Sequence, residues 1–350
     1  MKRELVSVII PAYNASRTIK RCLLSVLNQT YDRIEIIVID DCSTDGTSSQ
    51  IDSILENVGN KIVVHKKKNE MLEQARLDGV NCSHGSFITF IDADDYIELN
   101  AIEKMLNILK QKDADMVQCK CRTFISIGKF LKIHYPRSNN RQSVVVLKKE
   151  DIMSKVYMSF FGYGSFNVSA WSKLYRREHL INLKAGGLQY AQDQYMNMQV
   201  FPKLNSICVI NDALYHYELQ GMTSKYKPNY MNSTKRLYQI KLNYAEEMHS
   251  NAAKFYSTIE LRNCFKAQVE SMILHNVDTK ENIKKWIAEE LMDSTYDVFD
   301  WLKLQDKCDM SPMSVAIMDK DVESIYDLAR KDVYEWKWKK IARRILVHFN

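Results

Sequence analysis

Three carboxylates follow an apolar segment at the point where that segment ends. Residues 87–91, FITFI, are β-branched or aromatic throughout and predict a buried strand, and Asp92, Asp94 and Asp95 come directly after it. Like charges this close repel one another unless a cation lies among them. Paired aspartate oxygens suit Mg²⁺ or Mn²⁺, and Mg²⁺ usually completes its coordination with water and substrate phosphates. The spacing therefore indicates metal-assisted phosphate chemistry, with a solvated acidic turn before a helix as the alternative that the motif alone leaves open.

A second acidic pair follows another apolar segment. Residues 34–40, IEIIVID, predict a strand that ends in Asp40 and Asp41, and a turn-forming run rich in Asp, Ser, Thr and Gly comes next. Ligands of parallel sheets bind at the carboxyl ends of the strands. We therefore expect both acidic groups at the same edge of one sheet, where a ligand that holds a cation would explain them.

The elements that must hold these acids alternate between strand and helix through the first third of the chain. Such alternation indicates an α/β fold, a mostly parallel sheet with helices on both faces. The predicted strands cover 5–10, 34–40, 61–65, 87–92 and 115–121. A first predicted helix begins at a cap on Asn14 or Ser16, a second ends near Asn57, and two more cover 71–82 and 100–111.

Two longer stretches resemble a known family in order and spacing. Residues 6–47, VSVIIPAYNASRTIKRCLLSVLNQTYDRIEIIVIDDCSTDGT, and residues 85–97, GSFITFIDADDYI, are similar to the opening motifs of family 2 glycosyltransferases, of the type that builds bacterial surface polysaccharides. The resemblance covers about the first 120 residues, and its motifs are specific only in combination. It implies a GT-A fold with a mostly parallel sheet between helices, a nucleotide-sugar donor, and an inverting single displacement.

The resemblance also implies roles for individual residues when they are carried over by position. Asp41 is expected to accept a hydrogen bond from the nucleobase, most often uracil, and Asp94 to bind a divalent ion on the diphosphate. Asp95 is expected behind that site or on the acceptor side. The remaining expectations are Pro11, Ala12 and Tyr13 lining the base pocket, Asp92 and Ala93 facing the ribose or sugar, and His216 as an additional metal ligand.

The segment NEMLEQARLDG, residues 69–79, departs from the family pattern. It keeps Asn69, Ala75, Arg76 and Gly79, but Met71 and Leu77 stand where members usually carry Gly and Asn. Because guanidinium groups suit phosphate oxygens, Arg76 is expected at the base or the diphosphate, with a solvated helix arginine as the alternative.

Direct displacement at an anomeric carbon needs a carboxylate to take the acceptor's hydroxyl proton. Residues 186–201 resemble the family's element that carries this base, and Asp193 is the expected base, with a plain helix cap as the alternative. Gln192 stands where Glu is usual, and the loss of that like charge should make Asp193 less basic.

Residues 169–180, SAWSKLYRREHL, also resemble a family segment. Trp171 either stacks on an acceptor sugar or belongs to the core, and Lys173 and Arg176 are candidate diphosphate or acceptor contacts.

Composition narrows the class of protein and its location. The 350 residues include eight scattered cysteines without paired spacing, which disfavours a disulfide scaffold or a zinc finger. The net charge of +6 is concentrated towards the C-terminus. A protein that coats nucleic acid would spread its basic residues further, so this class is disfavoured. The N-terminal apolar run is too short for a signal peptide, and no stretch is apolar enough to span a bilayer. We expect a cytoplasmic enzyme, at most peripheral on the inner face of the cytoplasmic membrane.

The chain is predicted to carry a catalytic domain, 1–227, and a helical extension, 228–350. The catalytic domain would comprise a donor half, 1–120, and an acceptor half, 121–227. Residues 334–350 predict a basic amphipathic helix with aromatic residues, which suits either an anionic membrane surface or packing on protein, including a second copy.

Together these features predict an inverting, metal-dependent transferase. It would move a hexosyl or N-acetylhexosaminyl group from a UDP-sugar to a saccharide or lipid-linked saccharide during cell-surface polysaccharide synthesis. A metal-dependent nucleotidyltransferase, which would release pyrophosphate, and a non-catalytic nucleotide-binding scaffold remain the alternatives. The sequence does not specify the sugar, the acceptor or the linkage.

Overall fold

The structure, a computed structural model, describes residues 4–56, 58–66, 68–127, 131–134, 143–219 and 226–348. For residues 125–127, 131–134 and 337–348 it describes the backbone alone. The chain divides into two compact units, one made of 1–160 and 164–225 and the other of 161–163 and 226–350.

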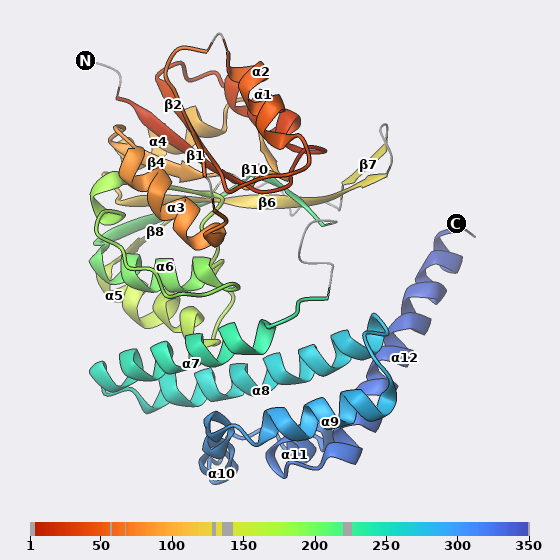
Figure 1. Ribbon diagram of the computed structural model, residues 1–350. Coiled ribbons are helices and arrows are strands. Elements are labelled where there is room, and N and C mark those ends of the chain that lie inside the picture. Colours follow the sequence, from red (N-terminus) through yellow and green to blue (C-terminus); the bar gives the residue numbers. More distant parts are fainter. Residues whose placement is uncertain are drawn as a thin grey trace. The chain divides into compact units, whose positions relative to one another are not determined.

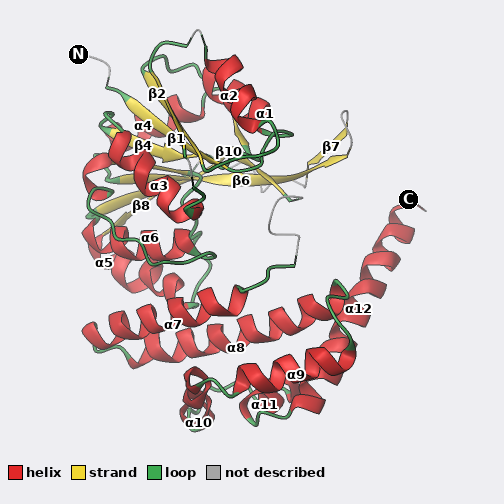
Figure 2. Ribbon diagram, viewed as in Figure 1, coloured by secondary structure: helices red, strands yellow, loops and turns green. Residues whose placement is uncertain are grey.

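One mixed sheet forms the centre of the first unit (Figures 1 and 2). Its strands follow the order β3-β2-β1-β4-β9-β6-β10-β5, with β7 added beside β6 and β8 beside β10. Pairing is parallel from β3 to β4 and between β6 and β10, while β9 runs antiparallel to both of its neighbours. The strands are β1 Val6–Ala12, β2 Ile34–Asp40, β3 Lys61–His65, β4 Phe87–Phe90, β5 Tyr96–Ile97, β6 Met116–Ile127, β7 Leu131–His134, β8 Val144–Lys148, β9 Lys173–Arg176 and β10 Ser206–Glu218.

Helices cover the sheet on both sides, which explains why β1 is buried along its whole length. Three of them, α1 Ile19–Leu27, α2 Thr47–Leu55 and α4 Ala101–Gln111, share one apolar core with the β1 side chains of Val8 and Ile10. A further helix, α3 Met71–Cys82, packs on the side of Ile9. Gly79 permits that approach, since a Cβ there would lie 2.4 Å from Ile9 Cγ2.

Several predicted elements are confirmed with their bounds, including the strands at 34–40 and 61–65 and the helix at 71–82. The predicted cap on Asn14 or Ser16 is wrong, because α1 begins at Ile19 after Thr18. Both residues instead bind the loop after β2. Asn14 Oδ1 accepts a hydrogen bond from Thr44 N at 2.8 Å, and Ser16 N donates to Asp45 Oδ2 at 3.1 Å. The polar loops at the ends of β1 and β2 therefore hold each other.

Short helical segments complete the first unit. The loop after β9 leads into α6, which begins with a carboxylate-bearing turn and lies beside α3 (Figure 1). These segments are α5 Lys149–Asp151, η1 Ile152–Val156, η2 Tyr157–Phe161, η3 Arg177–His179, α6 Gln192–Val200 and η4 Phe201–Lys203.

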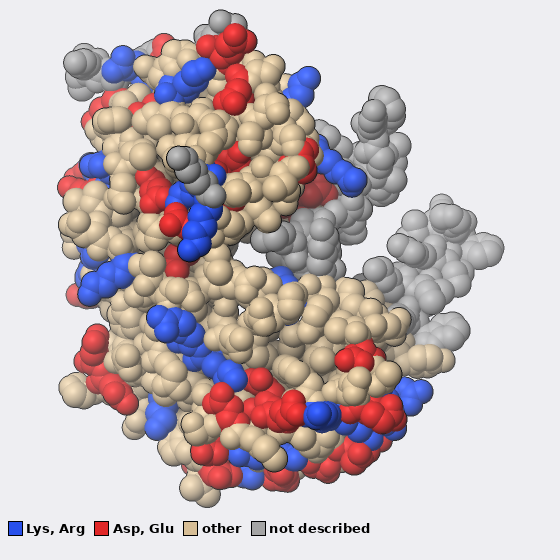
Figure 3. Space-filling view, viewed as in Figure 1, with Lys and Arg blue, Asp and Glu red and all other residues tan. Residues whose placement is uncertain are grey.

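The second unit is helical, as predicted for the region after Pro228. Its core gathers apolar side chains such as Phe265, Ile287, Phe299 and Ile325. On the face seen in Figure 3, acidic side chains gather on the lower part of this unit with basic ones among them. Its helices are α7 Tyr230–Glu247, α8 Asn251–Leu274, α9 Lys280–Leu291, η6 Ser294–Asp297, α10 Val298–Lys303, α11 Pro312–Met318 and α12 Val322–His348.

The predicted basic segment 334–350 falls largely outside the described side chains. The backbone of α12 continues as a helix through His348. In the part of the chain that the structure describes, no helix carries an apolar stretch long enough to cross a bilayer.

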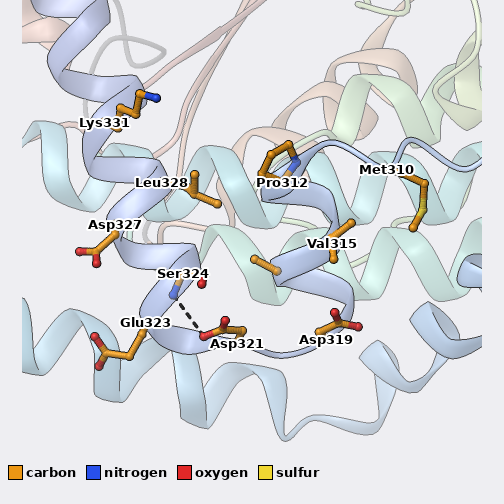
Figure 4. A pocket seen from close by; sticks show the side chains of 11 residues that line it. Met310, Pro312, Val315, Asp319, Asp321, Glu323, Ser324, Asp327, Leu328 and Lys331 are labelled. Carbon is orange, nitrogen blue, oxygen red and sulfur yellow. Dashed lines mark hydrogen bonds between the residues drawn. The ribbon is translucent and has the colours of Figure 1, made fainter.

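A surface hollow of about 690 Å³ lies between α11 and α12 (Figure 4). Its lining includes Pro312 and Leu328, together with the acids Asp319, Glu323 and Asp327. Asp319 pairs with Lys303 at 2.9 Å, and Glu323 pairs with Lys284. None of the residues singled out for chemistry lines this hollow.

Candidate active site

The carboxyl ends of β1, β2 and β4 lie side by side. Ala12 pairs with Asp40 in the register of β1 and β2, and Asp41 N donates to Ala12 O at 2.8 Å. On the other side, Ile91 N donates to Ile9 O at 3.0 Å, immediately before Asp92. The two acidic groups therefore lie at one edge of the sheet, as the alternation of strands and helices predicted.

The first acidic pair is held by the polar loops around it. Asp40 accepts hydrogen bonds from Ser43 N at 3.2 Å, from His65 Nδ1 at 3.2 Å and from the Ser48 hydroxyl. Burial opposes ionisation of Asp40, but these hydrogen bonds outweigh it and lower the pKa. This carboxylate is thus a fixed anion that braces the loop after β2.

Asp41 is also buried, and the segment before α3 wraps around it. Glu70 N donates to Asp41 Oδ1 at 2.9 Å, and Asn69 Nδ2 donates to its backbone oxygen at 3.3 Å. Beside it, Ala12 is buried while Tyr13 leaves 51% of its surface exposed. The residues expected to line the base pocket are therefore neighbours, with the Tyr13 ring open to solvent.

Met71, at the start of α3, adopts a backbone conformation that favours glycine. Its φ is 71°, in the left-handed region, and 48% of its surface is exposed. This explains physically why the family usually carries Gly here, and it shows that the chain tolerates a strained side chain beside Asp41.

Hydrogen bonds to β10 hold the loop that carries Asp92, Asp94 and Asp95. The Tyr215 hydroxyl accepts a hydrogen bond from Asp92 N at 3.2 Å and donates to Asp95 Oδ2 at 2.6 Å. Glu218 N donates to Asp95 Oδ1 at 2.8 Å. Asp95 has no exposed surface, and burial, with Asp92 and Asp94 nearby, raises its pKa well above the usual range. This geometry favours the expectation that Asp95 lies behind the site; a contact with the acceptor stays a prediction.

Asp94 lies closer to solvent than Asp95, and the nearby guanidinium of Arg21 donates to its backbone oxygen. Burial raises its pKa to about 6, and the charges of Asp92 and Glu218 add to the effect, while Arg21 opposes it. A divalent cation would stabilise the ionised form of such a group, so the donor set fits one. Among the described residues, no group of three or more His, Cys, Asp or Glu side chains is arranged to hold a metal ion.

His216 is buried on β10, where its ring stacks on Tyr96 with the centroids 4.2 Å apart. Its Nε2 lies 2.9 Å from Glu98 Oε1. Both of these contacts are with β5 and the residue after it, and the role of His216 as a metal ligand stays a prediction.

We call the rim the carboxyl ends of β1, β2 and β4 together with the carboxylates gathered there, and Arg76 lies in it between Asp92 and Asp193. Its Nη2 donates to Asp92 Oδ1 at 2.9 Å, and its Nη1 donates to Asp193 Oδ1. Only 3% of its surface is exposed, so the reading as a solvated helix arginine is wrong. Burial opposes its positive charge, but Asp193 and Asp92 outweigh burial and raise its pKa. One guanidinium therefore joins the acid at the end of β4 to the expected base on α6.

Asp193 stands in the first turn of α6 but does not cap that helix. Its Oδ2 accepts a hydrogen bond from Ala170 N at 2.9 Å, and its Oδ1 binds Arg76. The alternative of a plain helix cap is therefore wrong. With 20% of its side chain exposed, Asp193 keeps access to solvent at the rim.

Trp171 and Lys173 lie behind the rim. Trp171 stacks on Tyr215 at 4.9 Å and on Tyr217 at 5.2 Å between ring centroids, and it stays partly exposed. Lys173 is fully buried, its Nζ donates to Ser169 O at 2.7 Å, and burial lowers its pKa to about 7. Its burial removes it from direct contact with a diphosphate.

Arg176 lies at the opposite edge of the sheet. It pairs in register with Phe87, at the start of β4, and its Nη2 lies 2.7 Å from Asp113 Oδ1. The interpretation of Arg176 as a diphosphate contact is wrong, because β9 runs antiparallel and carries it away from Asp92.

Sequence reasoning missed the residues that support the site. Tyr215 has no motif of its own, although two-residue spacing with Tyr217 indicates one face of a strand. Arg21 on α1 donates to Asp94 O, lies 3.4 Å from Glu218 and faces the Phe124 ring at 4.8 Å. A lone arginine on a helix gives no signal for such a role.

A mostly parallel sheet between helices, with acidic residues at the carboxyl ends of its strands, is typical of the GT-A fold of glycosyltransferases. The sequence profile described as "Glycosyl transferase family 2" matches residues 7–183. The chain belongs to this family and is a glycosyltransferase.

Similar proteins include glycosyltransferase GlyG of Streptococcus pneumoniae, 29% identical over 61% of this chain and 70% of that protein. The poly(ribitol-phosphate) beta-glucosyltransferase of Bacillus spizizenii is 28% identical over 61% of this chain, which spans only 32% of that protein. Among solved structures, S. aureus TarS 1–349 in complex with UDP-GlcNAc has a TM-score of 0.64 and 22% identity, covering 95% of this chain and 92% of that one. At that identity the likeness shows the fold alone.

Proposed function

We propose that the protein transfers a sugar, with inversion, from a UDP-sugar to a saccharide or lipid-linked saccharide in the synthesis of a cell-surface polysaccharide. The observation that carries this proposal is the pairing of Asp92 and Asp193 on the Arg76 guanidinium. It brings the donor-side acid and a partly exposed carboxylate to one rim, as a single displacement requires. The complexes of the similar TarS with UDP and UDP-GlcNAc support a uridine donor.

Donor recognition would begin at Asp41, which accepts a hydrogen bond from the nucleobase between Ala12 and the segment before α3. The exposed ring of Tyr13 offers an apolar surface for that base. Asp92 and Ala93 would then face the ribose or sugar.

Transfer itself needs a proton acceptor near the acceptor hydroxyl, and Asp193 fills that role. As the acceptor oxygen forms its bond to the anomeric carbon, the hydroxyl proton passes to the Asp193 carboxylate. The bond from that carbon to the diphosphate breaks, and its electron pair leaves with UDP. Attack from the opposite face converts an α-linked donor into a β-linked product.

A divalent ion, Mn²⁺ or Mg²⁺, would be held by Asp94 together with the donor's phosphates. When bound, it neutralises the charge that develops on the departing diphosphate. The raised pKa of Asp94 is the observation that supports it, and His216 would be an additional ligand.

The acceptor would approach over Asp193, and the partly exposed ring of Trp171 would offer it an aromatic surface. The name of the B. spizizenii relative, a poly(ribitol-phosphate) glucosyltransferase, supports a surface polymer or its precursor as acceptor. Membrane contact through residues 334–350 and association into a homo-oligomer remain part of the proposal.

The test is the product that is released. The purified chain is incubated with Mn²⁺, a panel of UDP-sugars and saccharide acceptors, and uridine diphosphate and pyrophosphate are measured separately. We expect UDP release from one donor, lost in Asp193→Asn while UDP binding stays. Pyrophosphate as the product, or full transfer by Asp193→Asn, would refute the proposal.

A further inference from the structure

The loop that leads into α6 is held by a single side chain of α3. Gly186 N donates to Glu73 Oε1 at 2.8 Å, while Gly187 N and Leu188 N donate to Glu73 Oε2 at 2.9 and 3.2 Å. Three successive backbone N–H groups that converge on one carboxylate form an anion-binding nest. Here the bound anion belongs to the protein itself.

The two glycines make this nest possible. A Cβ on Gly186 would lie 2.7 Å from the ring of Tyr195, and Gly187 has a φ of 66°, in the left-handed region. Gly186 thus gives the loop a close approach that a Cβ would obstruct, and Gly187 takes a backbone conformation that favours glycine.

Glu73 and Arg76 lie three residues apart on α3 and hence on one face of that helix. Arg76 holds the Asp193 carboxylate, and Glu73 holds the backbone five to seven residues before it. The far end of the loop is tied to α6 by Gln199, whose amide exchanges two hydrogen bonds of 2.9 Å with Lys184. The helix α3 thus binds both the expected base, Asp193, and the 186–188 segment that precedes it.

We propose that Glu73 is a positioning residue for sugar transfer, which sets the place of Asp193 through the 186–188 loop. This inference rests on the proposed function and deepens it. It makes α3 the element that connects the donor half to the acceptor half. The residue before this helix binds Asp41, and the helix itself contacts α6. Glu73 does not touch the reacting atoms.

The closing experiment compares Glu73→Gln with Asp78→Asn, a matched control. Asp78 is another half-buried acid of α3, but it binds Lys66 and Gln74, not the loop. In Glu73→Gln the amide has a donor where the loop also presents donors, so the nest loses part of its partner. We expect kcat to fall on the order of 10- to 100-fold, as for a small displacement of a catalytic group, with UDP affinity unchanged. We also expect faster hydrogen exchange at the amides of 186–188.

Gly186→Ala, whose Cβ would lie 2.7 Å from the Tyr195 ring, displaces the nest from the loop side and should reproduce both effects, which guards against a folding defect of one variant. Asp78→Asn should match the wild type in kcat and exchange. Unchanged kcat or unchanged exchange in Glu73→Gln, with an active wild type, would overturn the positioning role alone. A wild type that releases no UDP refutes the proposed function and the positioning role with it.

Discussion

Replacing Arg76 with Met should separate the charge balance of the rim from its shape. Removing one partner of a buried ion pair costs about 3–5 kcal/mol, because the other charge is left uncompensated. Asp92 and Asp193 keep 22% and 20% of their side chains exposed, so water takes up part of that loss. We expect a decrease in the free energy of unfolding of about 2–3 kcal/mol for Arg76→Met. Arg76→Lys, which keeps one of the two contacts, should lose about 1 kcal/mol.

The activity of the same variants has a signature in pH. Arg76 opposes the effect of burial on the pKa of Asp92, and without it two carboxylates face each other. Ionising both carboxylates then needs a higher pH, so the acid limb of the kcat/KM profile should move to higher pH in Arg76→Met.

The assay is UDP release between pH 5 and pH 9, together with urea unfolding at pH 7.5. Arg176→Lys, at the opposite edge of the sheet, is the control and should leave the profile unchanged. An acid limb that stays in place in an active Arg76→Met enzyme would show that Arg76 does not govern the ionisation of the rim.

Three further changes test the support of the site. Asp94→Asn should stabilise the protein by about 1–3 kcal/mol at pH 7.5, as measured by urea unfolding. The pKa of Asp94 in the folded protein, about 6, lies above the ordinary 3.8, so the cost of ionising it on folding grows as pH rises between these values. In calorimetry the variant should lose any effect of Mn²⁺ on UDP binding. Met71→Gly should stabilise by about 0.5–1 kcal/mol through relief of its left-handed backbone, and His249→Gly, at a φ of 48°, is the matched control that should gain as much; a loss of stability would contradict the strain. Tyr215→Phe removes the hydroxyl partner of Asp92 N and Asp95 Oδ2 and should cost about 2–3 kcal/mol in thermal or urea unfolding. Near-neutral stability would exclude this expectation.

The sequence predicted secondary structure correctly where a short run of neighbouring residues favours one type of element. Runs such as 34–40 predicted strands with their bounds, and the alternation with helices placed Asp41 and Asp92 at one edge. Each of these inferences depends on neighbours within a few residues. They required no knowledge of how distant segments meet.

Prediction failed where long-range partners decide the role of a side chain. Arg76 and Asp193 are 117 residues apart, and nothing local in either segment indicates their contact. Arg176 was misread because the direction of β9 cannot be inferred from its own four residues. Glu73 was missed for the same reason, since its partners are backbone groups of a loop whose position depends on α6.

The positive groups near Asp94 bear on the divalent cation that the sequence indicated. Arg76 is already shared by Asp92 and Asp193, and Arg21 contacts Asp94 through the backbone oxygen instead of the carboxylate. Burial and the neighbouring charges of Asp92 and Glu218 raise the pKa of Asp94 to about 6, and Arg21 offsets only part of that rise. A nucleoside diphosphate alone would add negative charge and raise that pKa further. Donor and divalent cation should consequently bind with positive cooperativity, each increasing the affinity of the other by the same factor.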